Sequence, residues 1–317
     1  MSDTVRVSIV TPCYNSERTV AQTIASVRAQ TFTAWEHVVV DDGSTDRSAA
    51  IIAGLSAEEP RLRLVRQPNR GVAAARNRGY AECGVESAYV LFLDADDCAE
   101  PTMLAAMVAY LDAHPQVGML HCDICYIDAE GNDLGTELPE IGPFVRYGVD
   151  GGRVRRLAPD EPETPFFAVF APARIIPSVT LLRRSVYART PGWDEQFGQP
   201  CEDTHLFLHM ALLAPVHFLP ARLLRYRIHA GQSTRGRKIH HQKQKLYALW
   251  RNRTDLPDEA QALIREAVRL REGQLLPLLG LSEARRYLRR GDYAVALRCV
   301  LGALKRRLRH AVLAGPV

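Results

Sequence analysis

Short apolar runs that end abruptly in polar residues recur through the first hundred residues and constrain the fold more than any other feature. Residues 89–97 read YVLFLDADD, residues 36–46 read EHVVVDDGSTD, and residues 7–15 read VSIVTPCYN. Runs of this length are typical of buried strands. In open α/β sheets, ligands bind at the carboxyl ends of the strands. We therefore expect these three polar ends to meet at one edge of a sheet.

Segments with helical spacing lie between the runs. Val20, Ile24 and Val27 predict a helix over 17–30 with Ser16 as its cap. Further helices are predicted over 44–55 (opened by Ser44 or Thr45), 72–82, 102–113 and 203–213. Further strands are predicted over 62–65, 117–126, 178–182 and 223–228. This alternation predicts an α/β fold with a mostly parallel, doubly wound sheet. Residues 130–165 predict a long surface excursion, and 236–317 read as helices only.

The composition, 47% hydrophobic and 24% charged, is that of an ordinary globular protein. No apolar run is long enough for a transmembrane helix. The start, MSDTVR, lacks the features of a signal peptide, and an odd number of cysteines, seven, suggests reduced thiols. We therefore expect a cytoplasmic protein.

The charge is distributed unevenly. Residues 1–234 hold 21 Lys/Arg and 29 Asp/Glu, a net −8, whereas residues 235–317 hold 19 and 7, a net +12. The basic part suits anionic lipid headgroups or phosphorylated acceptors; no nucleic-acid module is recognisable. The sequence KRRLR at 305–309, near Leu301 and Leu304, leaves two interpretations open. It could form an amphipathic helix at the inner face of the plasma membrane, or a helix that packs on the rest of the chain or in a homodimer.

Three carboxylates, Asp94, Asp96 and Asp97, crowd the end of one predicted strand. Such crowding is costly unless a cation or hydrogen bonds compensate. Mn²⁺ or Mg²⁺ would do so, with substrate phosphates completing the shell. The structural alternatives to a binding role are a helix N-terminus for Asp97 and an Asp-Gly turn for Asp41 and Asp42. The sequence HCDIC at 121–125 is not read as a zinc site, because a strand sends its two cysteines to opposite faces.

Ordered motifs over residues 7–235 resemble those of family 2 glycosyltransferases of the GT-A fold. They read VSIVTPCYN (7–15), SVRAQTF (26–32), VVVDDGSTD (38–46), NRGVAAARN (69–77), LDADD (93–97), WDE (193–195), ED (202–203) and YRIH (226–229). The resemblance implies a glycosyltransferase domain over 1–235, with a nucleotide-binding half (1–100) and an acceptor half (101–235). The basic α-helical region 236–317 lies outside it.

The resemblance implies an inverting, metal-dependent transfer of a sugar from a nucleotide-sugar donor, with UDP or dTDP favoured. The acceptor would be a hydroxyl on a glycan, lipid-linked or small molecule, in bacterial surface glycan or glycoconjugate assembly. Asp42, with Asp41 beside it, would bind the base, and Pro12 and Tyr14 would line its pocket. Further donor and metal roles fall on Asn69, Arg70 and Arg76 (diphosphate), Asp96 and His229 (Mn²⁺ or Mg²⁺), Asp94 (ribose or metal), and Ser233 or Thr234 (assisting).

By the same resemblance, Asp203 would be the general base and Glu202 its supporting acid. Two departures concern the acceptor side: His209 stands where an arginine is usual, and Pro200 and Cys201 replace a Gly-rich approach. The alternatives are a non-catalytic nucleotide-sugar-binding protein and a nucleotidyltransferase, although the latter opens with a Gly-rich loop. The sequence TPCYN after the first strand is not G-x-G-x-x-G, which excludes a dinucleotide dehydrogenase.

Overall fold

The computed structural model describes residues 4–138, 145–171, 175–197, 199–229, 237–289 and 292–314. The chain forms two compact units. The first comprises 1–144, 159–165 and 174–246, and the second comprises 145–158, 166–173 and 247–317. The domain limits expected at residues 100 and 235 stay predictions.

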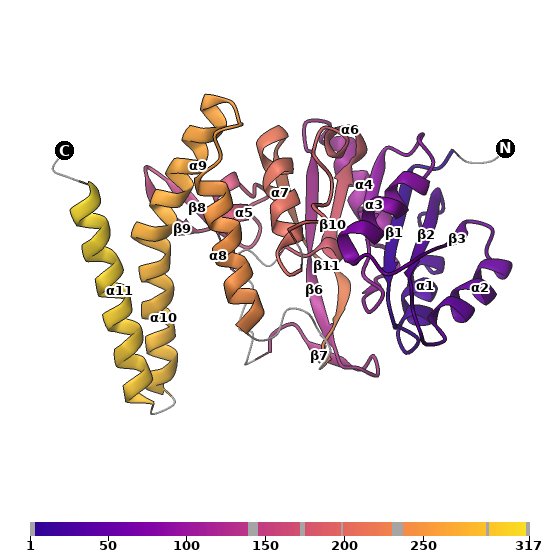
Figure 1. Ribbon diagram of the computed structural model, residues 1–317, viewed down its shortest axis with the longest axis horizontal. Helices are drawn as coiled ribbons and strands as arrows, with labels where there is room; N and C mark the ends of the chain where they lie inside the picture. Colours follow the sequence, from indigo (N-terminus) through magenta and orange to yellow (C-terminus); the bar gives the residue numbers. More distant parts are fainter. Residues whose placement is uncertain are drawn as a thin grey trace. The chain divides into compact units, whose positions relative to one another are not determined.

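The first unit is built on a nine-stranded sheet with the strand order β3-β2-β1-β4-β10-β6-β11-β5, and β7 pairs with β6 (Figure 1). The pairs β1–β2, β1–β4, β2–β3 and β6–β11 are parallel, and β10 lies antiparallel between β4 and β6. The expected mostly parallel α/β sheet is thus confirmed. The strands are β1 (Val7–Cys13), β2 (Trp35–Asp42), β3 (Leu62–Gln67), β4 (Tyr89–Phe92), β5 (Cys98–Ala99), β6 (Met119–Ile127), β7 (Asp133–Gly135), β10 (Thr180–Arg183) and β11 (Val216–Arg227).

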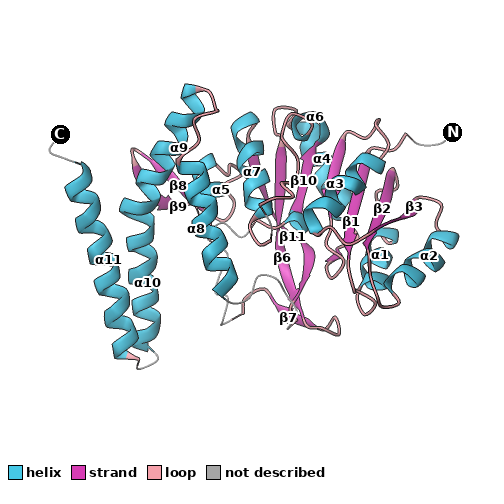
Figure 2. Ribbon diagram, viewed as in Figure 1, coloured by secondary structure: helices cyan, strands magenta, loops and turns pink. Residues whose placement is uncertain are grey.

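Helices cover both faces of this sheet (Figure 2). Side chains alternate between the faces of a strand. Val39 therefore packs with α1 and α2, in a cluster that includes Ile24 and Ile52, whereas Val10 and Val40 face α3 at Gly79. The helices of this unit are α1 (Val20–Arg28), α2 (Ser48–Glu58), α3 (Val72–Glu82), α4 (Met103–Ala113), α6 (Arg184–Tyr187), α7 (Glu202–Leu213) and most of α8 (Arg237–Arg251).

The starts of two helices differ from expectation. Helix α1 begins at Val20 and α2 at Ser48, and neither has a side-chain cap. The predicted caps Ser16 and Ser44 are wrong because both serines join the two strand-end loops to each other. The Ser16 amide donates to Ser48 Oγ, and the Ser44 hydroxyl accepts from the Asn15 amide.

The second unit contains an antiparallel hairpin and a set of helices. Its elements are β8 (Tyr147–Asp150), β9 (Arg153–Arg156), α5 (Phe166–Phe170), α9 (Asp258–Leu270), a π-helical turn (Arg271–Leu275), α10 (Leu276–Arg289) and α11 (Tyr293–Ala314). Phe166 and Phe170 of α5 pack on Trp250 and Tyr247, with ring centroids 6.3 and 5.3 Å apart. The stretch 130–165, expected to be a surface excursion, thus includes three short strands. No described helix combines the length and apolar character needed to cross a bilayer.

Gly79 and Gly54 allow a matched test of the contact between α3 and the sheet. A Cβ at Gly79 would lie 2.3 Å from Val10 Cγ1, whereas a Cβ at Gly54 of α2 would meet nothing within 4 Å. In urea unfolding, Gly79→Ala should lower the free energy of unfolding by about 1–3 kcal/mol through overpacking. Gly54→Ala should raise it by about 0.5–1 kcal/mol. Equal effects of the two substitutions would contradict this packing.

Candidate active site

A cleft of about 850 Å³ opens at the carboxyl ends of β1, β2 and β4. This volume is in the range of small-molecule sites. The parallel pairing brings the polar ends of the three strands to one edge, as the sequence predicted. Ten of the predicted site residues line the cleft: Pro12, Tyr14, Asp42, Asn69, Arg76, Asp94, Asp96, Glu202, Asp203 and His229.

The rim of the cleft is formed by two loops that bond reciprocally. Asn15 has a positive φ of 50°, and its Oδ1 accepts from the Thr45 amide at 2.8 Å. The Glu17 amide donates to Asp46 Oδ2, and the Glu17 carboxylate accepts from the Arg47 amide, both at 3.1 Å. These bonds fix the backbone after Tyr14, and the pairing of β1 with β2 fixes the backbone before it. The half-exposed ring of Tyr14 lies at the cleft.

Asp42 orders the loop that leads into α3. Its Oδ1 accepts from Gln67 Nε2 at 2.8 Å and from the Arg70 amide at 2.9 Å, and its Oδ2 accepts from the Gly71 amide at 2.8 Å. The carboxylate is almost fully buried yet reaches the cleft. Asp42 therefore shapes the loop that carries Asn69, whichever ligand it also contacts.

Asp41 has a different position. It is fully buried, and it accepts from the Ser44 amide and from Arg66 Nε, both at 3.2 Å. It is not among the residues that line the cleft. The expectation that Asp41 adjoins a bound base therefore finds no support in this geometry, because strand alternation turns it away from Asp42.

Arg76 joins two acidic parts of the cleft. Its Nη1 donates to Glu202 Oε1 at 2.9 Å and its Nη2 to Asp94 Oδ1 at 2.7 Å. The guanidinium is buried and stacks on Trp193, 4.3 Å from the ring centroid. Burial alone would lower the pKa of Arg76, but the two carboxylates outweigh it and hold the pKa above its ordinary value. The arginine expected at a diphosphate thus links the end of β4 to the start of α7.

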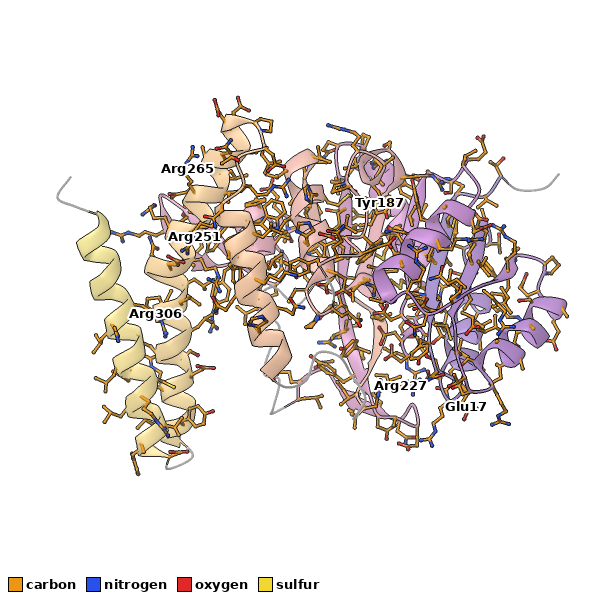
Figure 3. The ribbon with its side chains drawn as sticks, in the orientation of Figure 1. Glu17, Tyr187, Arg227, Arg251, Arg265 and Arg306 are labelled. Atoms are coloured by element: carbon orange, nitrogen blue, oxygen red, sulfur yellow. The ribbon has the colours of Figure 1, made fainter. Side chains whose placement is uncertain are left out.

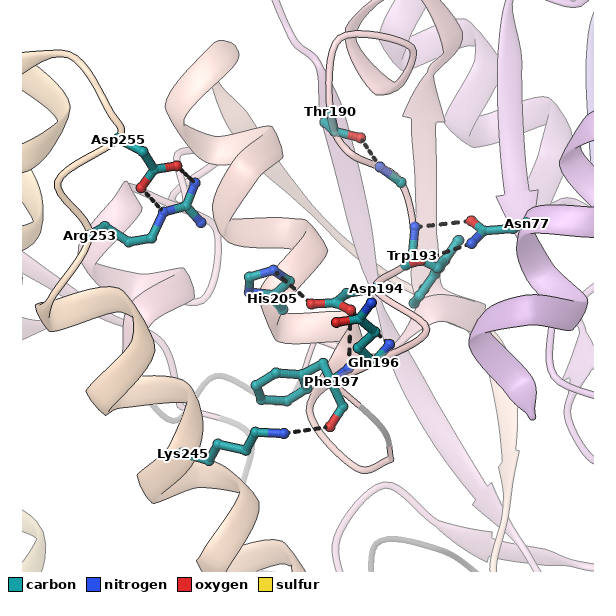
Figure 4. Close-up of polar contacts among 11 residues, drawn as sticks. Asn77, Thr190, Trp193, Asp194, Gln196, Phe197, His205, Lys245, Arg253 and Asp255 are labelled. Carbon is teal, nitrogen blue, oxygen red and sulfur yellow. Dashed lines mark hydrogen bonds and ion pairs between the residues drawn. The ribbon is translucent and has the colours of Figure 1, made fainter. Parts of the chain in front are cut away.

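Two reciprocal hydrogen bonds between Asn77 and Trp193 fix the loop that carries Trp193 (Figure 4). Asn77 Nδ2 donates to the Trp193 carbonyl at 2.8 Å, and the Trp193 amide donates to Asn77 Oδ1 at 3.1 Å. Glu195 accepts from Asn77 Nδ2 at 3.1 Å and from Arg70 Nη2 at 3.0 Å. In the same loop, Lys245 Nζ donates to the Phe197 carbonyl at 3.2 Å. Asn77 of helix α3 therefore holds the loop that carries Trp193, the ring on which Arg76 stacks.

Asp96 and His229 come together from distant parts of the sequence. His229 Nε2 lies 2.9 Å from Asp96 Oδ2, and each side chain is about one third exposed, at 31% and 34%. Asp97, in contrast, is buried, and burial together with the charges of Asp96 and Asp94 raises its pKa well above the ordinary value. The alternative that Asp97 opens a helix is wrong, because α4 begins at Met103 after the cap Thr102.

Arg227 is a structural residue that the sequence did not reveal. It is fully buried, and Figure 3 labels its position. Its Nε donates to the Asp96 carbonyl at 2.8 Å, and its Nη2 donates to Gln22 Oε1 at 2.6 Å. Its Nη1 donates to the carbonyls of Asp128 and Ala129, at 3.1 and 3.0 Å. Arg227 thus fixes the turn that presents Asp96. The YRIH motif contains it, but nothing in that pattern marks a buried charge.

Glu202 and Asp203 begin α7, directly after Cys201 with its positive φ of 86°. Burial, reinforced by the charge of Asp203 and opposed by Arg76, raises the pKa of Glu202 to about 7. Burial likewise raises the pKa of Asp203, which is partly buried and lines the cleft. A carboxylate with a raised pKa is a better proton acceptor near neutrality. His209 is not part of the cleft lining; it is nearly buried and packs edge-on against His205.

The donor set fits a divalent cation that shares its shell with a substrate. Within the described residues, no group of three or more His, Cys, Asp or Glu side chains is arranged to hold a metal ion. Asp96 and His229 offer one oxygen and one nitrogen ligand on the cleft. Mg²⁺ and similar ions commonly take few protein ligands and complete the shell with phosphates and water. Ser233 and Thr234 lie outside the described residues.

Solved structures with the same fold define the class of this architecture. A crystal structure of S. aureus TarS 1–349 superposes with a TM-score of 0.61 at 18% identity, over 96% of this chain and 88% of that one. The mannosyltransferase PcManGT from Pyrobaculum calidifontis, solved with GDP-Man and Mn²⁺, gives a TM-score of 0.58 at 18% identity, over 98% and 78%. The fold is that of the GT-A glycosyltransferases.

The sequence also matches a family model. Residues 8–160 match the family described as "Glycosyl transferase family 2". Uncharacterized glycosyltransferase YibD of Escherichia coli is 35% identical over 127 residues, which are 40% of this chain and 36% of the relative. O-antigen biosynthesis protein RfbC of Myxococcus xanthus is 36% identical over 148 residues, 45% of this chain and 12% of the relative. The matched segments thus span at most about a third of these two relatives.

The raised pKa of Glu202 should make stability depend on pH. Between about 4.3, the pKa of an unfolded glutamate, and about 7, the folded chain keeps a proton that the unfolded chain has lost. The stabilisation is complete below the lower value and is lost as pH rises to the upper one, by up to ~1.4 kcal/mol per pH unit. In urea unfolding from pH 4.5 to 7, Glu202→Gln should show a smaller decline than the wild type.

The decline should not vanish in this variant, because the pKa values of Asp94, Asp97 and Asp203 are also raised. Glu58→Gln, at an exposed glutamate of α2, is the control and should keep the slope of the wild type. A slope in Glu202→Gln as steep as that of the wild type would show that Glu202 does not hold the proton.

Proposed function

We propose that the protein is an inverting glycosyltransferase that moves a sugar from a UDP- or dTDP-linked donor to a hydroxyl acceptor. The observation that carries this proposal is that one cleft combines the Asp96–His229 pair with Asp203. The likeness of this chain, over 148 and 126 residues, to an O-antigen biosynthesis protein and to chondroitin synthase supports a place in bacterial surface glycan or glycoconjugate assembly.

On the donor side, the base would lie against Pro12 and Tyr14, with Asp42 accepting the imide N–H. Each carboxylate oxygen can accept more than one bond, so the bonds from Gln67 and the loop amides leave Asp42 with capacity for this contact. TarS, which shares the fold, has been crystallised with UDP and with UDP-GlcNAc. This supports a uridine nucleotide as the first donor to test.

Asp96 and His229 would hold Mn²⁺ or Mg²⁺ at the diphosphate. A cation bound there supplies neutralisation of the charge that develops on the departing nucleoside diphosphate. Asp94 is held through Oδ1 by Arg76, which leaves Oδ2 for the ribose or the metal shell. Asn69 lines the cleft beside the start of α3, where the diphosphate would bind.

On the acceptor side, Asp203 would take the proton from the acceptor hydroxyl while its oxygen attacks the anomeric carbon. The leaving group departs from the opposite face, so that the configuration inverts. The raised pKa of Asp203 favours this proton transfer near neutral pH. Glu202, bonded to Arg76, would support Asp203 and contact the acceptor or the donor sugar. The acceptor would be a glycan, a lipid-linked molecule or a small molecule.

Asp96→Asn tests the cation site by calorimetry with UDP, with and without Mn²⁺. In the wild type, Mn²⁺ should tighten UDP binding. In the variant, the increase in UDP affinity caused by Mn²⁺ should be about 10–100-fold smaller, because the substitution replaces the charged oxygen ligand. Asp112→Asn, which changes a carboxylate of α4 bonded to Arg6, should retain the gain. An Mn²⁺-linked gain in Asp96→Asn equal to that of the wild type would refute the assignment.

Asp203→Asn tests the general base, once a donor screen with Mn²⁺ has identified the sugar by nucleoside-diphosphate release. The variant should bind the donor within about twofold of the wild type, and its kcat for transfer should fall by about 10²–10⁴. Product NMR should show the anomeric configuration inverted relative to the donor. Full transfer by Asp203→Asn, or retention of configuration, would contradict the proposed mechanism.

A further inference from the structure

The helix pair α10–α11 packs through small side chains. A Cβ at Gly280 of α10 would lie 3.3 Å from the Cβ of Ala303 and 2.9 Å from Arg306 Nη2 of α11 (Figure 3 labels Arg306). Ala284, Ala296 and Ala303 are each at most 2% exposed. Small side chains therefore lie at the contact between the two helices.

Four larger side chains of α11 are exposed. Tyr293, Leu297, Leu301 and Leu304 are 70%, 59%, 55% and 48% exposed. Their spacings of four, four and three residues put them on one face of a helix. We call these four residues the α11 stripe. Single exposed leucines are ordinary on a protein surface, whereas an aligned set of apolar side chains marks an interaction surface.

Positive charge borders the α11 stripe. Arg298 and Lys305 are exposed, and each follows a stripe leucine by one position, so both lie along the same edge of the stripe. Over residues 276–314 the sequence holds nine Lys/Arg and only two acids, Glu283 and Asp292. Asp292 accepts from the Val295 amide at the start of α11. The surface beside the stripe is therefore cationic.

We propose that the α11 stripe docks on an anionic membrane surface, with α11 lying in the plane of the interface. Leucines would enter the headgroup boundary, while Arg298 and Lys305 would meet anionic headgroups. A symmetric contact between two copies would instead bring these cations toward their counterparts, which charge complementarity disfavours. This inference concerns the second unit alone and does not depend on the proposed catalytic function.

Vesicle flotation of the full chain tests the proposal. The wild type should bind vesicles that contain phosphatidylglycerol, release them in high salt, and ignore pure phosphatidylcholine. Leu297→Gln with Leu301→Gln should weaken partitioning by about tenfold per leucine. Arg298→Gln with Lys305→Gln should weaken it by about 30-fold, since each cation near an anionic surface contributes about fivefold.

Leu263→Gln is the matched control, because Leu263 is 43% exposed on α9 and lies outside the stripe. It should float with anionic vesicles as the wild type does. Circular dichroism and thermal unfolding should report each variant as folded, since all five positions are exposed. Absence of wild-type binding, or unchanged binding in the leucine pair, would overturn the proposal. So would a wild-type dimer in sedimentation equilibrium that the leucine pair dissociates, without any vesicle binding, because the stripe would then join two copies.

Discussion

The ion pairs of one buried guanidinium organise the cleft of this protein. Arg76 bonds to Asp94 after β4 and to Glu202 at the start of α7, and Trp193 stacks on it. Without that charge, the buried Glu202 and the partly buried Asp94 would have no cation opposite them, which is destabilising. The relative position of the strand-end acids and the acids of α7 therefore depends on Arg76.

A second buried arginine, Arg227, also stabilises the cleft, but through different partners. Arg227 bonds mainly to carbonyl oxygens, and so it fixes backbone, including the turn that presents Asp96. Even with both arginines present, the pKa values of Asp94, Asp97, Glu202 and Asp203 are all raised. The protein thus offsets the negative charge of these acids only in part. Such a site favours a cation that binds together with the substrate.

Much of this arrangement could be predicted from the sequence, and the exceptions have physical causes. Apolar runs located the strands, and parallel pairing explains why their polar ends share one cleft. The sequence could not separate Asp41 from Asp42, since the two differ only in the face toward which alternation turns them. The predicted helix starts were wrong where Ser16 and Ser44 bond to a neighbouring loop rather than to their own helix. The partners of Arg76 and Arg227 depend on burial and on residues more than a hundred positions away, which no local pattern records.

The reciprocal bonds between the Asn15–Glu17 loop and the Thr45–Arg47 loop have a thermodynamic consequence. Flexible loops that close on a ligand lose conformational entropy, which weakens the complex. Here the backbone on both sides of Tyr14 is already ordered by the protein itself. An incoming nucleoside would therefore meet backbone that is already ordered, and its binding would not carry the entropic cost of ordering this loop.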